Sequence, residues 1–266
     1  MPKHTITDFF IPIEQQADTT IARSMIIEKI RLVNEESIFY SIESSIYRSF
    51  CENNPWARRN LIIFAQSYAL MKNDAGLHQR IKAAYACEST NETLASILTP
   101  CTRAFLSDYG PHRRALAPEP ESWVARILGK PLGVQKAMAR TAKHTNLQAL
   151  LRSSEPSVVQ ILCENPRIKE ADIIFIASRQ PCVYEALRCI LESKHIFQYE
   201  VRSAIAHNPY LAVGDCLRLL PTLGTNTLKS LAAQNLMHPI VISTIENYFE
   251  LLNRAFKLNP NNAPPF

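Results

Sequence analysis

Apolar residues recur at intervals of three and four along most of the chain, which is the spacing of one face of an α-helix. Ile38, Ile42 and Ile46 lie four apart in a segment whose other positions are largely polar. The chain has only 6 glycines against 17 prolines, which favours short helices ended by proline over sheets with many tight turns. The pattern therefore predicts an all-α fold.

Five helices are expected before residue 108. The first begins after Asp18, a residue type suited to a helix N-cap. The second ends at Asn53-Asn54-Pro55, and the third begins at Pro55 because proline costs nothing in a first helical turn. The expected ranges are 19–33, 35–50, 55–72, 77–88 and 91–106.

Beyond residue 121 the predicted helices become shorter and more frequent. Pro156, Pro181 and Pro239 stand where helices can begin, while Asn165-Pro166 and Asn208-Pro209 mark helix ends, because a residue before proline is kept out of the α region. A helix of about 10 residues is not stable alone in water, so each antiparallel pair must pack on the next, as in an α-solenoid. Helix starts are expected near residues 121, 131, 146, 156, 170, 181, 199, 212, 226 and 239.

Several of these segments resemble bacterial HEAT-like repeat proteins, including those called leucine-rich repeat variants. Ser154-Glu155-Pro156-Ser157-Val158 is similar to their helix start, and Asn165-Pro166 and Asn208-Pro209 are similar to their helix breaks, with Leu219-Leu220-Pro221 in the later unit. The resemblance covers about residues 122–252. It implies a right-handed stack of antiparallel helix pairs that binds other macromolecules and has no catalytic residues of its own.

A segment with three prolines and one glycine, residues 108–121, is the expected linker between two regions. The predicted division is an extended arm at 1–17, an N-terminal helical region at 18–107, HEAT-like repeats at 122–256 and a disordered tail at 257–266. The N-terminal helical region is expected to stack on the repeats as a further layer.

The composition points away from enzymes and membrane proteins. There is no Gly-rich phosphate loop, no nucleophilic Ser turn and no pair of His on one helix face, so no catalytic residue, metal or cofactor is expected. Cys182 and Cys189 are seven apart, about 10 Å along a helix, which is too far to share a metal without other ligands. His207, His238, Asp172 and Asp215 stand at predicted helix ends, where capping roles are favoured over catalytic ones.

The expected location is the cytoplasm. Seven scattered cysteines are more typical of reduced thiols than of an extracellular disulfide framework. The N-terminus lacks a secretory signal and the chain has no apolar run of about 18 residues, so no membrane partner is expected.

Positive charge is concentrated between Cys101 and Arg152, where nine Lys/Arg face three acids. A surface of this kind supports nucleic-acid binding through phosphate contacts, and the competing interpretation is a solvated outer face with a few surplus charges. The candidate binding residues are Arg113, Arg114, Arg126, Lys130, Lys136, Arg140 and Lys143.

The N-terminal arm contains a second candidate site. Ile6, Phe9 and Phe10 would lie on one side of a single helical turn, similar to the short peptides that dock on sliding clamps, although Lys3 stands where those peptides have Gln. The alternative is that the two aromatic residues fold back and cover the end of the first helix pair, as the ends of solenoids require.

The leading function predicted from the sequence is a non-enzymatic scaffold that binds a protein partner through the inner face of the superhelix. The alternative is a HEAT-like nucleic-acid-binding protein, connected with DNA repair, that uses the basic stretch 103–152. A purely structural or oligomerising module is the third class, and no small-molecule substrate is evident.

Overall fold

The computed structural model describes residues 10, 13, 16–113, 122–141, 144–234 and 236–258. Within these ranges the chain is helical and has no strand; the one β-type contact is an isolated bridge between Pro111 and Ala212. The all-α prediction is confirmed. No helix in the described ranges has the length and apolar character needed to cross a membrane.

The first helices begin at residues that satisfy their free N–H groups. Four of the five have an Asp or Asn N-cap whose side-chain oxygen accepts from the first turn: Asp18, Asn34, Asn54 and Asp74. These helices are α2 (Thr19–Leu32), α3 (Glu35–Phe50), α4 (Pro55–Asn73), α5 (Ala75–Tyr85) and α6 (Ala95–Leu106). The five predicted helices are therefore confirmed, with boundary differences at α5 and α6.

Those boundary differences come from a nine-residue connection, 86–94, between α5 and α6. The predicted ranges extended helix into both ends of this connection. In the structure Asn91 accepts from the N–H groups of Thr93 and Leu94, and the Ser89 N–H donates to Thr99 Oγ1 at 2.9 Å. These side-chain acceptors compete with helical hydrogen bonds and hold the segment in an irregular conformation.

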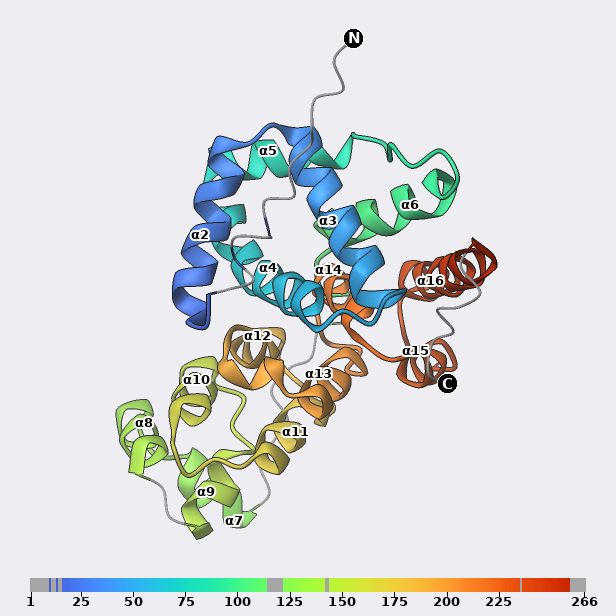
Figure 1. The fold of residues 1–266 in the computed structure, drawn as a ribbon. Coiled ribbons are helices and arrows are strands. Elements are labelled where there is room, and N and C mark those ends of the chain that lie inside the picture. The colour runs from blue at the N-terminus through green and yellow to red at the C-terminus, as the bar shows by residue number, and fades with distance from the viewer. Residues whose placement is uncertain are drawn as a thin grey trace. The chain divides into compact units, whose positions relative to one another are not determined.

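The chain divides into two compact units, one of residues 1–109 with 213–266 and the other of residues 110–212. The predicted division is corrected here, because the segment after Val213 belongs with the N-terminal helices and not with the preceding repeats. Its helices are α14 (Val213–Leu219), η2 (Leu220–Thr222), α15 (Thr225–Ala232) and α16 (Pro239–Leu258). In Figure 1, α14 lies beside α4, and it also contacts α6 and α16.

Buried polar contacts explain that correction. Arg218, with 3% of its surface exposed, donates to Ser107 O at 2.7 Å and pairs with Asp215 at 2.8 Å. Its guanidinium also lies 3.7 Å from the centre of the Tyr68 ring. A buried guanidinium needs these partners, so α14 is held against the end of α6 and against α4.

Residues 110–212 contain shorter helices; each described α-helix begins close to a predicted start, whereas the short 3₁₀ helix η1 was not predicted. α10 packs against both α8 and α12, α9 packs against α7, and α13 packs against α11 (Figure 1). The largest difference from prediction is at Pro181, since the helix begins at Tyr184. The helices are α7 (Ser122–Leu128), α8 (Leu132–Thr141), α9 (His144–Leu150), α10 (Pro156–Glu164), α11 (Glu170–Ser178), α12 (Tyr184–Glu192), η1 (Lys194–Phe197) and α13 (Tyr199–Ala206).

Four polar side chains connect these helices in a regular way, and we call them the bridging side chains. Each lies at or after the end of one helix and donates to a carbonyl at the end of the helix two earlier. The pairs are Asn165 with Ala139, Arg179 with Leu151, His195 with Cys163, and Asn208 with Ala177. The last carbonyls of a helix lack partners within that helix, so each bridging side chain satisfies one of them and fixes its neighbour.

The sequence predicts a separate segment at each end of the chain, an arm at 1–17 and a tail at 257–266. Ile13 is helical and Phe10 lies in a turn, with the Ile13 N–H donating to Phe10 O at 2.8 Å, while most of the predicted arm at 1–17 lies outside the described residues. At the other end α16 continues to Leu258, beyond the predicted helix end at 256. The rest of the predicted tail, 259–266, also lies outside the described residues.

Candidate functional site

The structure describes five of the seven predicted basic residues. Arg126, Lys130 and Arg140 are exposed, while Arg113 and Lys136 are half-buried. Arg114 and Lys143 lie outside the described residues. Lys136 and Arg140 are one turn apart on α8, as their spacing predicts.

The whole net charge of the chain belongs to residues 110–212. That unit has 14 Lys/Arg and nine Asp/Glu, whereas the other has 15 of each. Part of the surplus has a structural role, because Arg167 donates to Thr141 O and Arg179 to Leu151 O and Ser153 O. A count of basic residues therefore overstates the charge that is available to a ligand.

The predicted docking peptide can be assessed at one position. Phe10 has 0% of its surface exposed, as does Ile13. A phenylalanine in this position contributes to the core of its own chain, which favours the packing interpretation over a plug for a partner. Ile6 and Phe9 lie outside the described residues, so their docking role stays a prediction.

Three of the four polar residues predicted to lie at helix ends have the capping roles expected of them. His207 Nδ1 donates to Ser203 O at 2.7 Å, and His238 Nδ1 accepts from the Ile240 N–H at the start of α16. Asp172 accepts from the Lys169 N–H at 2.9 Å, and Asp215 pairs with Arg218. The contacts of His207, His238 and Asp172 are those that the capping interpretation predicts, whereas Asp215 forms an ion pair within α14.

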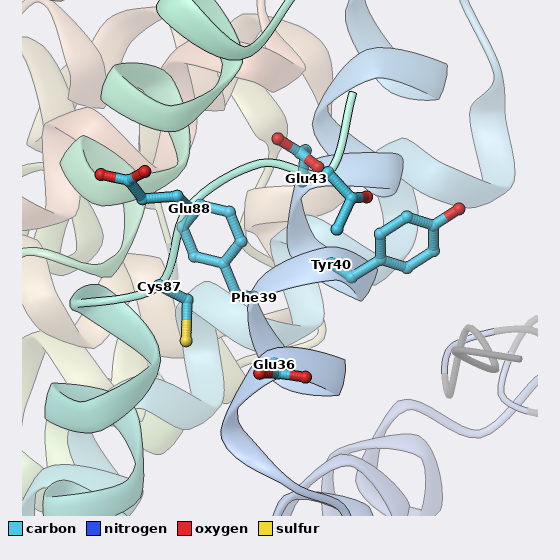
Figure 2. Close-up of a pocket in the computed structure, with 7 residues that line it drawn as sticks. Glu36, Phe39, Tyr40, Glu43, Cys87 and Glu88 are labelled. Atoms are coloured by element: carbon cyan, nitrogen blue, oxygen red, sulfur yellow. The ribbon is translucent and has the colours of Figure 1, made fainter. Parts of the chain in front are cut away.

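A cavity that the sequence did not bring to attention lies between α3 and the 86–94 connection, and we call it the α3 pocket (Figure 2). Its volume is about 200 Å³. Four lining residues come from one face of α3, at positions i, i+3, i+4 and i+7, and the other three follow α5. The lining residues are Glu36, Phe39, Tyr40, Glu43, Cys87, Glu88 and Thr90.

Glu43 is the unusual member of this set. Only 4% of the surface of Glu43 is exposed, and its Oε1 has no hydrogen-bond partner among the described residues. Burial raises the pKa of the Glu43 carboxyl above its ordinary value, and a hydrogen bond with the Ser89 side chain partly opposes the shift. A buried carboxylate oxygen without a partner is costly, and Glu43 is one of the residues that line the cavity, so its carboxyl group is a strong acceptor in the pocket wall.

The rim of the pocket contains two further carboxylates, Glu36 and Glu88, both exposed. Arg103 lies 3.6 Å from Glu88 and donates to the Cys87 carbonyl. Burial raises the pKa of the Cys87 thiol, Glu36 and Glu35 raise it further, and Arg103 opposes them. Cys87 is therefore a protonated thiol near neutral pH, which is the inactive form of a cysteine nucleophile.

The walls of the pocket are aromatic. Phe39 is buried and Tyr40 half-buried, and Figure 2 shows both on α3 with Cys87 and Glu88 across from them. Within the described ranges no group of three His, Cys, Asp or Glu is placed to hold a metal ion. The arrangement is suited to binding a group that combines an apolar surface with hydrogen-bond donors.

The sequence does contain part of the signal for this site. Glu43 lies beside the Ile38, Ile42 and Ile46 stripe, so a reading of α3 as an amphipathic helix places a charge at the edge of the core. The opposite wall could not be predicted, because the predicted helix 77–88 includes Cys87 and Glu88, which lie in the irregular connection 86–94 together with Thr90.

Comparisons of the chain with protein-family models, with curated proteins and with solved structures find no match. The resemblance to HEAT-like repeats therefore stays a prediction from the residues. The geometry of the α3 pocket and the distribution of charge are the two features that bear on function.

Proposed function

We propose that this protein is a non-enzymatic helical scaffold that binds a protein partner, with the α3 pocket as one point of contact. The observation that carries the proposal is a cavity of about 200 Å³ with a buried, unpartnered glutamate oxygen. Sites for small molecules usually measure about 300–1,000 Å³, so this cavity suits a single side chain. Protein interfaces commonly gain most of their affinity from a few side chains inserted into such pockets.

Residues 110–212 provide the second part of the proposal, a HEAT-like α-solenoid that serves as a frame. Two observations support it: helices two apart in the chain pack against each other, and the bridging side chains repeat at intervals of 14, 16 and 13 residues. Repeats of this kind are rigid along their stack and present extended surfaces to partners. The cytoplasm is the proposed location, supported by seven cysteines that are all free thiols.

Site-directed photo-crosslinking tests the protein partner. A photoreactive amino acid replaces Thr90, which is exposed at the pocket rim, and in a control protein it replaces Glu246, exposed on α16. The proposal predicts a covalent product with one protein from the native lysate at position 90 and not at position 246. That protein, purified, must then bind the unmodified chain; no product above the control rejects the proposal.

Nucleic-acid binding is the second candidate, and the confinement of the net charge to residues 110–212 favours it. Arg126, Lys130 and Arg140 are exposed there, and phosphate contacts require exposed cations. The repair-related version of this candidate rests on the HEAT-like resemblance alone.

Salt dependence separates this candidate from the first. Affinity for a DNA duplex should fall steeply as salt rises, and Arg126→Glu with Arg140→Glu should reduce both the affinity and the salt slope. The matched control reverses Lys82 and Lys229, which are exposed in the other unit. Binding that is absent, insensitive to salt, or equally weakened in the control would exclude nucleic acid.

A further inference from the structure

The geometry of the α3 pocket points to a specific occupant: we propose that it binds the ammonium group of a lysine side chain. The inference rests on the proposed protein partner for the source of that lysine. The preference for an ammonium group follows independently from the charges of the pocket, its aromatic residues and its acceptor atoms.

The charge of the lining selects a cation. Glu36 and Glu43 come from α3 and Glu88 comes from the connection, so carboxylates lie on both sides of the cavity. Arg103 partly neutralises Glu88 at 3.6 Å, whereas Glu36 and Glu43 have no ion pair among the described residues. An attraction of this kind is strongest at Glu43, because burial removes the water that would screen it.

The walls select a cation that has an apolar stem. Phe39 and Tyr40 line the cavity together with the carboxylates, and aromatic rings attract an ammonium group while packing against its methylene chain. A metal ion or a bare ammonium ion would leave these surfaces without a partner. A lysine side chain, with four methylene groups below its charge, would contact both kinds of surface.

The acceptors at the base of the pocket favour an ammonium group over a guanidinium. The Glu43 side chain already has a hydrogen bond with Ser89, and Oε1 is the oxygen without a partner. Arginine binds carboxylates best through a fork that uses both oxygens. An ammonium group needs single acceptors in several directions, which the carboxyl group of Glu43 and the two rim carboxylates can supply.

The test uses the full chain and n-butylammonium, which is the lysine side chain without its backbone. NMR titration should give shifts confined to α3 and the 86–94 connection, with a dissociation constant on the order of 1–10 mM for so small a ligand. n-Butylguanidinium should bind at least threefold more weakly, and n-butanol should give no saturable shift. Equal shifts with n-butanol would mean that the pocket recognises only the alkyl chain, which overturns the proposal.

The decisive variant is Glu43→Gln, with Glu246→Gln as the control for a lost negative charge. The Glu43 variant should weaken n-butylammonium binding at least tenfold, and the control should leave it unchanged. Thr90→Lys is a second variant at an exposed rim position, where the new side chain can enter the pocket and compete with the ligand. Binding that survives in both folded variants would overturn the assignment of the pocket.

Two further arms identify the source of the ammonium group. Nα-acetyl-lysine-N-methylamide should bind within threefold of n-butylammonium, whereas spermidine binding tenfold tighter would assign the pocket to free polyamines and overturn the protein source. Crosslinking from position 90 in the Glu43→Gln variant separates the lysine contact from the scaffold proposal. An undiminished product would reject the lysine contact but leave the scaffold proposal intact. Ammonium binding with no crosslinked protein in any background would reject the scaffold instead.

Discussion

The two units of this chain are both helical, yet they are stabilised in different ways. In the unit formed by residues 1–109 and 213–266, α3, α4 and α16 have 16, 19 and 20 residues and bury long apolar faces. In residues 110–212 no described helix exceeds the 10 residues of α8. Short helices bury little apolar surface each, so that unit relies in addition on bridging side chains that connect each helix to the one two earlier.

The difference extends to charge and to function. The unit with long helices has no net formal charge and contains the α3 pocket, whereas residues 110–212 have the entire excess of +5. A long helix such as α3 can have an apolar face for the core and an acidic edge for a ligand on the same element. Short stacked helices use many of their polar side chains to satisfy their own ends.

The largest expected effect is a loss of stability in the unit with long helices. Arg218→Met should lower the free energy of unfolding by about 3–5 kcal/mol, because it removes bonds to the end of α6 and takes the positive charge away from the buried Asp215. Urea denaturation measures the change. Arg254→Met, which removes a half-buried arginine that pairs with Glu250 and donates to Ser96 Oγ, should cost less than about 1 kcal/mol.

The next largest effect is a loss of stability in the unit with short helices. Asn208→Ala should cost about 2–3 kcal/mol, since it removes two donated bonds and leaves the carbonyls of Ala177 and Arg179 unsatisfied. Amide exchange should rise first at the ends of α11 and α13. Asn146→Ala, at an exposed position of α9, should change stability by no more than about 0.5 kcal/mol, and equal costs would contradict the bridging role.

Substitution of one glycine in each unit by alanine should change the stability of the protein in opposite directions. A Cβ on Gly214 would lie 3.1 Å from Ser107 O, Tyr109 O and the Arg218 guanidinium, so Gly214→Ala should destabilise by about 1–2 kcal/mol. A Cβ on Gly133 of α8 would meet nothing within 4 Å. Gly133→Ala should therefore stabilise by up to about 1 kcal/mol, and thermal denaturation of both variants gives the two signs.

The smallest effect concerns Glu43 and depends on pH. Burial raises the pKa of this carboxyl in the folded state, so its contribution to stability falls as pH rises from its ordinary pKa through the raised one. Glu43→Gln should equal or exceed the wild-type stability, with an advantage that grows as the pH rises above about 4. Glu36 and Glu88 are present in both proteins and cancel. A variant that is less stable at pH 7 would indicate a structural role for Glu43.

The helices of this protein could be predicted because their signals are local. Asp18 and Asn54 cap from within three residues, and Pro156 and Pro239 begin helices by their own geometry. The division into units could not be predicted. The contact that holds α14, from Arg218 to Ser107, spans 111 residues, and nothing in the local sequence at Ala212 and Val213 marks a boundary.

The candidate site was predictable only in part for the same reason. The spacing of Glu36, Phe39, Tyr40 and Glu43 places them on one face of α3, but the wall that makes this face a pocket comes from an irregular connection. Arg126, Lys130 and Arg140, three of the basic residues predicted from the sequence, are exposed.

Titration of n-butylammonium against the wild-type chain and Glu43→Gln, followed by NMR, tests the central claim most directly. Saturable shifts confined to α3 and residues 86–94, weakened at least tenfold by the substitution in a protein of unchanged fold, are the predicted result. Shifts of equal size and affinity in the two proteins would contradict it.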